Sequence, residues 1–337
     1  MSEEAPEPAP APRAAEPGRT LDPPRPAVLD AVRRALDEDL LPLGDLTAGL
    51  VDDDRRATLH LVARGDGVIA GSACAAEAFA RVDARVEVRW SRVDGDRVEP
   101  GAVVATVGGP LRSILTAERT ALNFLGHLSG VATLTDRFVR AVQAVDPRVR
   151  VLDTRKTTPG LRALEKAAVR AGGGHNHRAN LSDAVLVKDN HLVGVSIAEA
   201  VARARSWWPG RMVEVECDRA DQVRHACEAG VTSVLLDNMT PADAACCVAL
   251  ARAIDPRVLV EVSGGITLET APEYAAAGVD LLSVGALTHS APVLDLGLDL
   301  LGPEPVPHRG SSGGGPDRLE PEPAPDRART GPEGRGA

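Results

Sequence analysis

Lysine is rare in this sequence, and its three lysines lie close together. Lys156, Lys166 and Lys188 are the only lysines, and arginines make up the remaining 35 of the 38 basic residues. A lysine ammonium is a compact charge whose pKa shifts readily, so it supports different chemistry from a planar guanidinium. Segment 152–191 contains all three lysines and also three of the eight histidines, His175, His177 and His191. We interpret this segment as the chemical centre of the protein.

Four cations in this segment lie at the ends of two predicted strands or in the loop between them. They are Arg155, Lys156, Arg178 and Lys188. Because gathered like charges repel unless an anion lies among them, and guanidinium groups bind carboxylates in pairs of hydrogen bonds, they favour a small ligand with two anionic groups. The alternative is that they pair with the nearby aspartates, Asp153, Asp183 and Asp189.

Two acidic residues, Glu216 and Asp237, end two later predicted strands. Carboxylates at such positions can hold ribose hydroxyls, bind a hard metal ion such as Mg²⁺, or stabilise a developing positive charge. Glu214 lies two residues before Glu216, so the strand period places both side chains on one face.

A Ser-Gly-Gly sequence after another predicted strand offers backbone N–H groups for a phosphate. Ser263, Gly264 and Gly265 form this sequence, and Gly285 and His289 follow the next strand. In (β/α) barrels the late strands commonly provide the phosphate site. The alternative interpretation is an ordinary glycine turn.

The His175-x-His177 pair could begin a metal site, but it follows three glycines and precedes Arg178. A neighbouring cation disfavours a bound metal ion. We therefore expect His177 to form a hydrogen bond with substrate rather than to bind metal.

The elements that position these residues repeat one pattern from about residue 147 to residue 290. Short β-branched runs, each followed by a polar residue and an Ala-rich helical stretch, occur at 149–152, 184–187, 212–215, 234–236, 258–262 and 281–284. Continuous apolar runs predict strands covered on both faces, hence a parallel sheet wrapped by helices. Six such units favour a (β/α) barrel, with an open sheet as the alternative. In a barrel all the polar strand ends would face one rim.

Between the first two of these strands, the sequence predicts a helix with clear end signals. Thr158 and Pro159 suit its N-cap and first position, and Gly172 suits its end.

The N-terminal part predicts an α+β domain beside the barrel. We expect a helix over 27–41, strands over 57–64, 67–71 and 85–90, and a helix over 116–142.

On the 116–142 helix, Arg119 and Asn123 share one face, and Gly126 and Gly130 continue it. We expect this polar, closely approachable stripe to face either solvent, a ligand site or a second subunit.

Composition limits the remaining possibilities. Segments 1–26 and 302–337 each hold eight of the 26 prolines and few large apolar residues, so we expect disordered tails. The net charge is −10 with no basic run, which argues against nucleic acid. No apolar run reaches the ~20 residues that span a bilayer, and the sequence shows no export signal. The five cysteines form no C-x-x-C pair, which is typical of a reducing, cytoplasmic protein.

Over about residues 28–300, the sequence resembles the quinolinate phosphoribosyltransferase family, also called carboxylating nicotinate-nucleotide pyrophosphorylases. The motifs that carry the resemblance are TAERTALNFL, LDTRKTTPGLR, GGGHNHR, VKDNH, VEVEC, LLDN, VSGGI and SVGALTHS. Departures are few: Ala167 stands where the family commonly has tyrosine, and the tails have no family counterpart.

The resemblance implies a cytoplasmic, homodimeric enzyme of de novo NAD biosynthesis. It would convert phosphoribosyl pyrophosphate and quinolinate into nicotinate mononucleotide, pyrophosphate and carbon dioxide, with Mg²⁺ as cofactor. The implied fold is α/β: an N-terminal α/β sandwich domain and an incomplete (β/α) barrel. We assign 1–26 to a tail, 27–145 to the sandwich, 146–290 to the barrel, 291–302 to a segment that packs back on the N-terminal domain, and 303–337 to a second tail.

The resemblance also implies roles for the candidate residues. The quinolinate carboxylates would be held by Arg119, Arg155, Lys156, His177, Arg178 and Lys188, with Arg119 donated across the dimer. Glu216 and Asp237 would hold the ribose, and Mg²⁺ would bind mainly through substrate, with these two acids as candidate ligands. The phosphates would lie at Ser263, Gly264, Gly265, Gly285 and His289. Glu216, Asp237, Lys156 and Lys188 are the predicted catalytic residues.

Two alternatives remain at this point. One is a barrel paralogue acting on another substrate, such as the transferase-like proteins linked to molybdenum transport. The other is a non-catalytic binding protein that keeps the fold. The complete set of cations argues against the first, and the intact acid pair and Ser-Gly-Gly sequence argue against the second.

Overall fold

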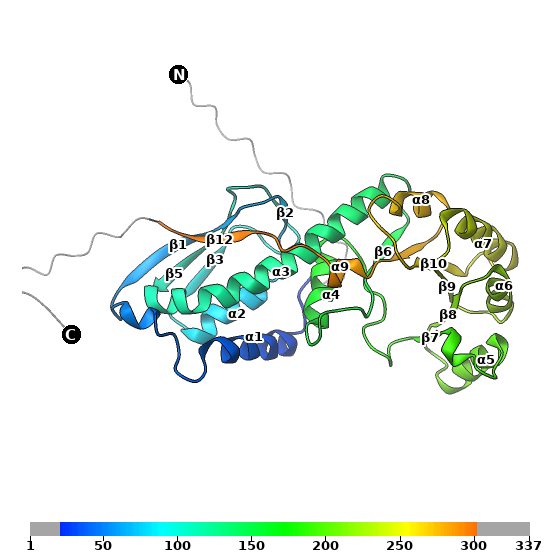
Figure 1. Ribbon diagram of the computed structural model, residues 1–337, viewed down its shortest axis with the longest axis horizontal. Coiled ribbons are helices and arrows are strands. Elements are labelled where there is room, and N and C mark those ends of the chain that lie inside the picture. Colours follow the sequence, from blue (N-terminus) through cyan, green and yellow to red (C-terminus); the bar gives the residue numbers. More distant parts are fainter. Residues whose placement is uncertain (1–20, 302–337) are drawn as a thin grey trace, which may run out of the picture. The chain divides into compact units, whose positions relative to one another are not determined.

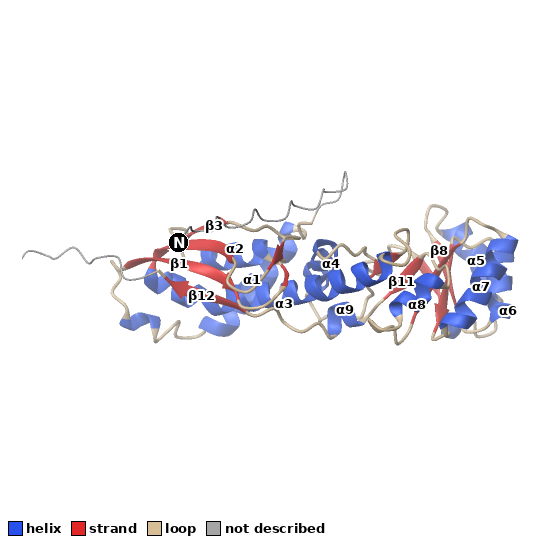
Figure 2. Cartoon of the chain, turned by 90° about the horizontal axis from the view of Figure 1, so that it is seen from above, coloured by secondary structure: helices blue, strands red, loops and turns tan. Residues whose placement is uncertain are grey.

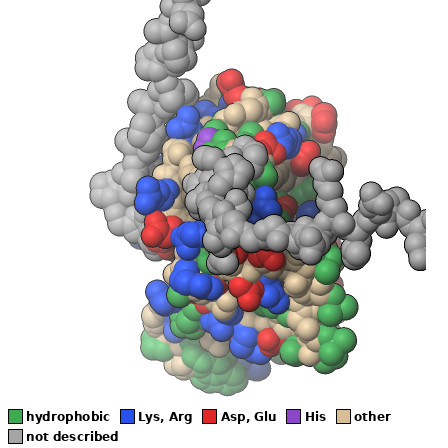
Figure 3. Space-filling model, turned by 90° about the vertical axis from the view of Figure 1, so that its left-hand side faces the viewer, with side chains coloured by type: hydrophobic (Ala, Val, Ile, Leu, Met, Phe, Trp, Pro, Cys, Tyr) green, Lys and Arg blue, Asp and Glu red, His purple; other side chains and the backbone are tan. Residues whose placement is uncertain are grey.

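A computed structural model describes residues 21–301, which form a mixed α/β structure (Figure 1). Residues 1–20 and 302–337, where most of the two predicted tails fall, lie outside the described residues. Between residues 21 and 301, no helix has the combination of length and hydropathy that a membrane span requires. Acidic and basic side chains both occur on the face shown in Figure 3, and hydrophobic side chains gather at its lower edge.

The N-terminal part is built on a four-stranded antiparallel sheet with the order β12-β1-β5-β3. Its strands are β1 (Arg56–Ala63), β3 (Glu87–Trp90), β5 (Val103–Pro110) and β12 (Leu296–Leu300). The helices of this part are α1 (Arg25–Leu40), α2 (Ser72–Val82) and α3 (Leu111–Gln143), with the 3₁₀ turn η1 (Ala48–Leu50). A separate pair joins β2 (Gly67–Val68) to β4 (Arg97–Val98).

The last described strand returns to the N-terminal sheet (Figure 2). β12 pairs antiparallel with β1, from Leu59 opposite Leu300 to Ala63 opposite Leu296. The sheet is therefore completed by a strand from the far end of the described chain.

The second part is a six-stranded parallel sheet with the order β6-β11-β10-β9-β8-β7. The strands are β6 (Arg150–Leu152), β7 (Val185–Val187), β8 (Val213–Cys217), β9 (Ser233–Asp237), β10 (Leu259–Ser263) and β11 (Leu281–Ser283). The intervening helices are α4 (Arg162–Ala171), η2 (Asp189–His191), α5 (Ile197–Trp207), α6 (Ala220–Glu228), α7 (Pro241–Ile254), α8 (Ala271–Ala276) and α9 (Ala286–His289). The first two strands of the repeat, β6 and β7, form its two edges, and no strand pairing within the described chain joins them. The parallel α/β sheet is confirmed, and this pairing is that of an open sheet.

Strands β8 and β9 are buried on both faces, as predicted, but alternate residues of β8 and β10 have opposite chemistry. Val213, Val215 and Cys217 of β8 are buried apolar residues, whereas Glu214 and Glu216 alternate with them. The register pairs Glu216 with Leu235 and Leu235 with Glu261. Because residues i and i+2 share a face, one face of the sheet carries the acids and serines while the other packs in the apolar core.

The helix α3 connects the two parts, and its glycines pack against this chain's own backbone. A Cβ atom on Gly130 would lie 2.1 Å from the carbonyl oxygen of Pro292, and the N–H of Leu294 donates to the carbonyl of Gly126 (2.9 Å). The expectation that Gly126 and Gly130 face solvent, a ligand or a second subunit is therefore wrong. Close approach of the segment before β12 explains both glycines.

Most predicted elements are confirmed, and the departures have local causes. The helix predicted to begin at Thr158 and Pro159 begins at Arg162, because Gly160 adopts a positive φ of 80° and interrupts the chain before it. Helix α2 and strand β5 were not predicted from the sequence. Helix α2 follows Gly71, whose φ is 98°.

Candidate active site

A cavity of about 330 Å³ lies at the carboxyl ends of the parallel strands. Eight predicted site residues line it: Arg155, Lys156, His177, Arg178, Lys188, Glu216, Asp237 and Ser263. These residues come from six different strand ends or loops that lie far apart in the sequence. Three further polar residues line the cavity but were not among the predicted site residues: Thr154, Glu261 and Ser283.

Three of the four predicted cations lack a carboxylate partner. Within residues 21–301, no ion pair involves Arg155, Lys156 or Arg178, and the buried Nε of Arg155 has no hydrogen-bond partner. Burial, together with the neighbouring charge of Arg155, lowers the pKa of Arg178. Such unpaired, mutually repelling cations around a cavity are what an anionic ligand would stabilise.

The alternative pairing with aspartates fails for these cations. Asp153 bonds Lys166, and Asp183 accepts the N–H of Ala179 (2.9 Å). The fourth cation, Lys188, does have a carboxylate partner, but it is Glu216 rather than Asp189.

Lys166 serves a different purpose from the other two lysines. Its side chain is 5% exposed and its ammonium bonds both Asp153 and the carbonyl of His177 (2.9 Å). Asp153 also accepts the N–H of His177 (2.9 Å). Because Asp153 directly precedes Thr154-Arg155-Lys156, this buried pair fixes the end of β6 relative to the loop that carries His177 and Arg178. The three lysines that cluster in the sequence therefore have two different roles: Lys166 is structural, and Lys156 and Lys188 line the cavity.

The predicted acid pair lies in the cavity, and each acid has one local partner. Glu216 bonds Lys188 from the neighbouring strand end. Asp237 accepts a hydrogen bond from the side-chain amide of Asn238 (2.8 Å), a residue held at a positive φ of 53°. Both carboxylates keep oxygens available to a ligand in the cavity, since neither is fully buried.

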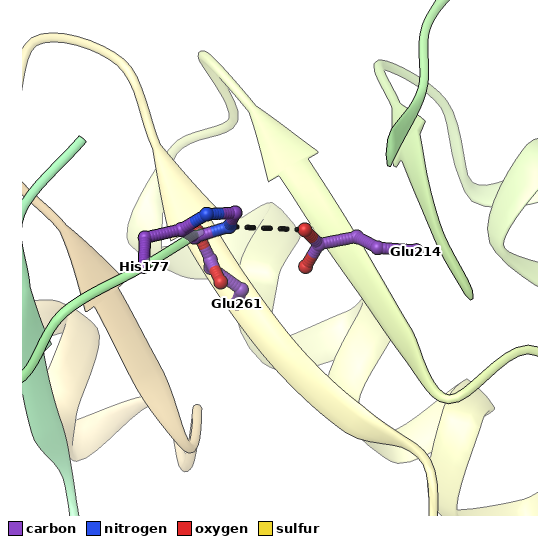
Figure 4. Close-up of side chains that lie close together, drawn as sticks. All are labelled: His177, Glu214 and Glu261. Carbon is purple, nitrogen blue, oxygen red and sulfur yellow. Dashed lines mark hydrogen bonds and ion pairs between the residues drawn. The ribbon is translucent and has the colours of Figure 1, made fainter. Parts of the chain in front are cut away.

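The side chain of His177 lies beside two buried acids, Glu214 and Glu261 (Figure 4). Its Nε2 bonds Glu214 Oε2 (3.0 Å) and lies 3.5 Å from Glu261 Oε1, and its Nδ1 accepts the N–H of Arg178 (2.7 Å). Burial and the nearby Glu214 carboxylate raise the pKa of Glu261. The alternation in Val-Glu-Val-Ser, residues 260–263, was the sequence signal that could have placed Glu261 on the cavity face.

Of the predicted phosphate residues, Ser263 lines the cavity, whereas Gly264, Gly265, Gly285 and His289 are not among its lining residues. Gly264 and Gly265 have φ angles of 98° and 59°, and their N–H groups donate to no acceptor within the described chain. A Cβ atom on Gly264 would lie 2.1 Å from Asn238 Oδ1. Gly285 is close to Lys156 and His289, since a Cβ atom on it would lie 3.2 Å from Lys156 Cδ and 3.1 Å from His289 Nε2.

Arg119 is the one predicted cation that the structure does not place in this cavity. It is exposed on α3 and lines a separate cavity of about 240 Å³ with Asn123, His127 and Leu161. His127 bonds Glu165 (2.9 Å), whose second oxygen accepts the N–H of Thr158 (3.1 Å).

Comparison with known proteins gives the same family along most of the chain. Residues 45–129 match the family "Quinolinate phosphoribosyl transferase, N-terminal domain", and residues 131–299 match the corresponding C-terminal domain. The nicotinate-nucleotide pyrophosphorylase [carboxylating] of Mycobacterium leprae is 44% identical over 280 residues, covering 81% of this chain and 97% of that protein. A probable enzyme of the same name from Bacillus subtilis is 41% identical over 260 residues, covering 76% and 88%. The solved nicotinate-nucleotide pyrophosphorylase of Francisella tularensis superimposes with a TM-score of 0.77 at 39% identity, covering 82% and 97%.

Proposed function

The chain belongs to the quinolinate phosphoribosyltransferase family, and from this premise we propose how its cavity performs the family reaction. The enzyme transfers the phosphoribosyl group of phosphoribosyl pyrophosphate to the ring nitrogen of quinolinate. Pyrophosphate and carbon dioxide leave, and nicotinate mononucleotide enters NAD biosynthesis. The observation that carries this proposal is one cavity that unites four cations with the Glu216–Asp237 acid pair.

The cations hold the two carboxylates of quinolinate. Arg155 and Arg178 can each form paired hydrogen bonds to a carboxylate, and Lys156 adds a point charge at the edge of the cavity. Because these three have no carboxylate partner within residues 21–301, substrate binding does not first have to break an ion pair. The clamped carboxylates orient the ring so that its nitrogen faces the ribose.

The acid pair acts on the ribose. Departure of pyrophosphate leaves positive charge on the ribosyl group in the transition state, and Glu216 and Asp237 stabilise this charge in a site with little water. Lys188 links the acid pair to the quinolinate cations, because it bonds Glu216 and lines the same cavity as the cations. Once the nitrogen is ribosylated, the bond to the adjacent carboxylate breaks and carbon dioxide leaves. The cationic ring stabilises the electron pair left on that ring carbon, which then takes a proton from water.

The phosphate groups bind at the edge of the cavity. The unpaired N–H groups of Gly264 and Gly265 and the nearby Gly285 and His289 provide donors for the anionic oxygens. Ser263 lines the adjoining cavity wall.

The protein residues alone are a poor site for magnesium, and the substrate would have to provide most of the ligands. Glu216 and Asp237 provide the oxygen ligands that Mg²⁺ prefers, but Glu216 is already bonded to Lys188. We therefore expect Mg²⁺ to bind mainly through the pyrophosphate, where it neutralises the charge of the leaving group.

We further propose a cytoplasmic homodimer in which Arg119 completes the partner's site. Every other proposed quinolinate ligand comes from the parallel-sheet part, whereas Arg119 is exposed on α3 and lines another cavity of its own chain. A two-fold dimer would supply two such arginines reciprocally.

A reaction mixture tests the proposal directly. Purified protein with quinolinate, phosphoribosyl pyrophosphate and Mg²⁺ should form nicotinate mononucleotide and carbon dioxide in equal amounts. Chromatography would measure the nucleotide, and release of ¹⁴C from labelled quinolinate would measure the carbon dioxide. Binding of quinolinate without product would favour a non-catalytic protein. Turnover of phosphoribosyl pyrophosphate with a different acceptor only would favour the paralogue.

A further inference from the structure

Glu261 lines the cavity, and Glu214 lies beside it and His177; the proposed mechanism uses neither carboxyl group. The side chains of Glu214 and Glu261 are each 1% exposed, and that of His177 is 9% exposed. One ligand atom from each of the three lies within 4.8 Å of the others (Figure 4). Glu214 lies on β8 and Glu261 on β10, with β9 between them; Ser233 of β9 is in register with Glu214, and Leu235 of β9 is in register with Glu261.

These two carboxyl groups cannot both be ionised beside a bound dianion. Buried like charges at this separation repel strongly, and one of two such carboxyls normally keeps its proton. The proposed ligand would bring two further negative charges to the same cavity. The cluster therefore has to hold one proton more than a neutral histidine with two carboxylates.

The hydrogen bonds indicate which atom carries this proton. Nδ1 of His177 accepts the N–H of Arg178 (2.7 Å), so this nitrogen has no proton. The ring proton is then on Nε2 and is donated to Glu214 (3.0 Å), which acts as the ionised acceptor. Oε1 of Glu214 and Oε1 of Glu261 both lack a hydrogen-bond partner within the described chain. Because Glu214 accepts the proton of His177 through Oε2 and Glu261 makes no such bond, we place the additional proton on Glu261.

The surroundings of Glu261 support the same assignment. Glu214 from β8 and His177 from the loop after α4 are the titratable groups that face it, while β9 and β11 place Leu235 and Leu281 in register with it. Burial, with the charge of Glu214 added, raises the pKa of Glu261 to about 8. The neighbouring His177 opposes this rise in the pKa of Glu261.

We propose that Glu261 is a protonated carboxylic acid that donates a hydrogen bond to a carboxylate of quinolinate, and so helps the site to select a dicarboxylate. Glu261 lines the same cavity as the cations. A neutral donor there adds a contact to an anionic ligand without adding positive charge, and rejects ligands that lack an acceptor at that point. This inference rests on the proposed function for the identity of the ligand, but not for the proton itself.

The first test needs no substrate and no activity. The infrared spectrum of the substrate-free protein at pH 7 should contain a C=O stretching band of a buried carboxylic acid that shifts in D₂O. Glu261→Gln should remove this band, and the matched control Glu273→Gln, an exposed glutamate on α8, should keep it. A wild-type spectrum without such a band, or a band that survives in Glu261→Gln, would overturn the proposal.

The second test measures quinolinate binding by calorimetry between pH 7 and pH 9. The donor is present below the pKa of Glu261 and is lost as the pH rises through it, so the wild-type Kd should rise about tenfold over this range. Glutamine keeps an N–H donor and does not titrate, so Glu261→Gln should bind with a similar Kd at both pH values. Glu261→Ala lacks the donor and should bind about 10- to 100-fold more weakly at pH 7.

The two tests separate the possible failures. If the infrared band is present but the protein neither binds quinolinate nor forms product, the proposed function fails while the protonated Glu261 stands. If quinolinate binds but Glu261→Gln loses affinity with pH as the wild type does, the donor role is wrong. Stoichiometric metal in the purified protein, lost in Glu261→Gln, would show that the cluster holds a cation instead of the proton.

Discussion

At the scale of single residues, the cations in and near the cavity fall into two groups: those with a carboxylate partner and those without one. Arg155, Lys156 and Arg178 have no carboxylate partner within residues 21–301, whereas Lys188 bonds Glu216 and Lys166 bonds Asp153. The free cations should therefore show the strongest dependence on the anionic substrate.

The first prediction concerns these free cations. Lys156→Ala and Arg178→Ala should each weaken quinolinate binding by about 2–3 kcal/mol, because a charge-assisted hydrogen bond is lost. The KM for phosphoribosyl pyrophosphate should change much less. Steady-state kinetics with both substrates varied would measure this, with Arg224→Ala, on the exposed face of α6, as the control. Equal losses for the two substrates would show that the cations do not form a separate quinolinate clamp.

The second prediction concerns the acids. Glu216→Gln and Asp237→Asn keep the shape of each side chain but remove the charge that stabilises the ribosyl transition state. Each should lower kcat by about 100-fold or more while changing quinolinate affinity by a smaller factor. Single-turnover measurements would separate the chemical step from product release. A nearly normal kcat in either variant would contradict the assigned role.

At the scale of elements, a buried ion pair determines how two walls of the cavity meet. Asp153 ends β6, Lys166 lies on α4, and both bond the backbone of His177. The burial of both side chains opposes their charges: it raises the pKa of Asp153 and lowers that of Lys166. Three donors to Asp153, including the side chain of Asn176, compensate by favouring its carboxylate form.

The third prediction tests this pair. Lys166→Met should lower the free energy of unfolding by about 3–5 kcal/mol, because the Asp153 carboxylate remains buried without its cation. The double variant Lys166→Met/Asp153→Asn should recover part of this loss, since the uncompensated charge is gone. Urea unfolding of the single and double variants gives the coupling energy. A stable Lys166→Met protein would mean that the surroundings of Asp153 already neutralise it.

At the scale of the whole molecule, the candidate site is incomplete within one chain if Arg119 binds substrate. The structure leaves Arg119 on α3, outside the cavity that holds the other cations. Exposed leucines at positions 41, 43, 46 and 50 lie in the connection from α1 to β1, which also contacts α3 through the bond between Asp45 and Thr116 (3.1 Å). Exposed apolar side chains in this number are typical of an interaction surface.

The fourth prediction tests whether Arg119 acts across a dimer. Homodimers of Arg119→Ala and of Lys156→Ala should both be nearly inactive. After random subunit exchange, about half of the dimers would be hybrids with one intact and one doubly damaged site, so activity should recover to roughly a quarter of the wild type. Exchange should be verified independently with differently tagged chains. If activity does not return although hybrids form, Arg119 acts in its own chain or outside the site.

The sequence predicted many of the residues that line the cavity, because residue type and strand position are local properties. Arg155, Lys156 and Lys188 follow recognisable strands, Arg178 lies in the loop between those strands, and polar residues at the carboxyl ends of parallel strands share one edge. The same reasoning placed Glu216, Asp237 and Ser263 in the cavity that the structure shows. The parallel order could be expected from repeated strand–helix units, since each crossover returns the chain in the same direction.

Only the tertiary structure showed that residues of the same type have different roles. Lys166 and Lys188 look equivalent in sequence, but α4 directs one to a buried aspartate and the strand end of β7 places the other in the cavity. Gly130 looked available to a ligand or second subunit, and a segment more than 150 residues later covers it. Glu214 and Glu261 are 47 positions apart, and the strand order β8-β9-β10 brings them to one histidine. The sequence determined which groups exist and in what strand period they occur. Which of them become neighbours depended on packing between segments distant in the chain, because burial and charge pairing are properties of the folded arrangement rather than of any local pattern.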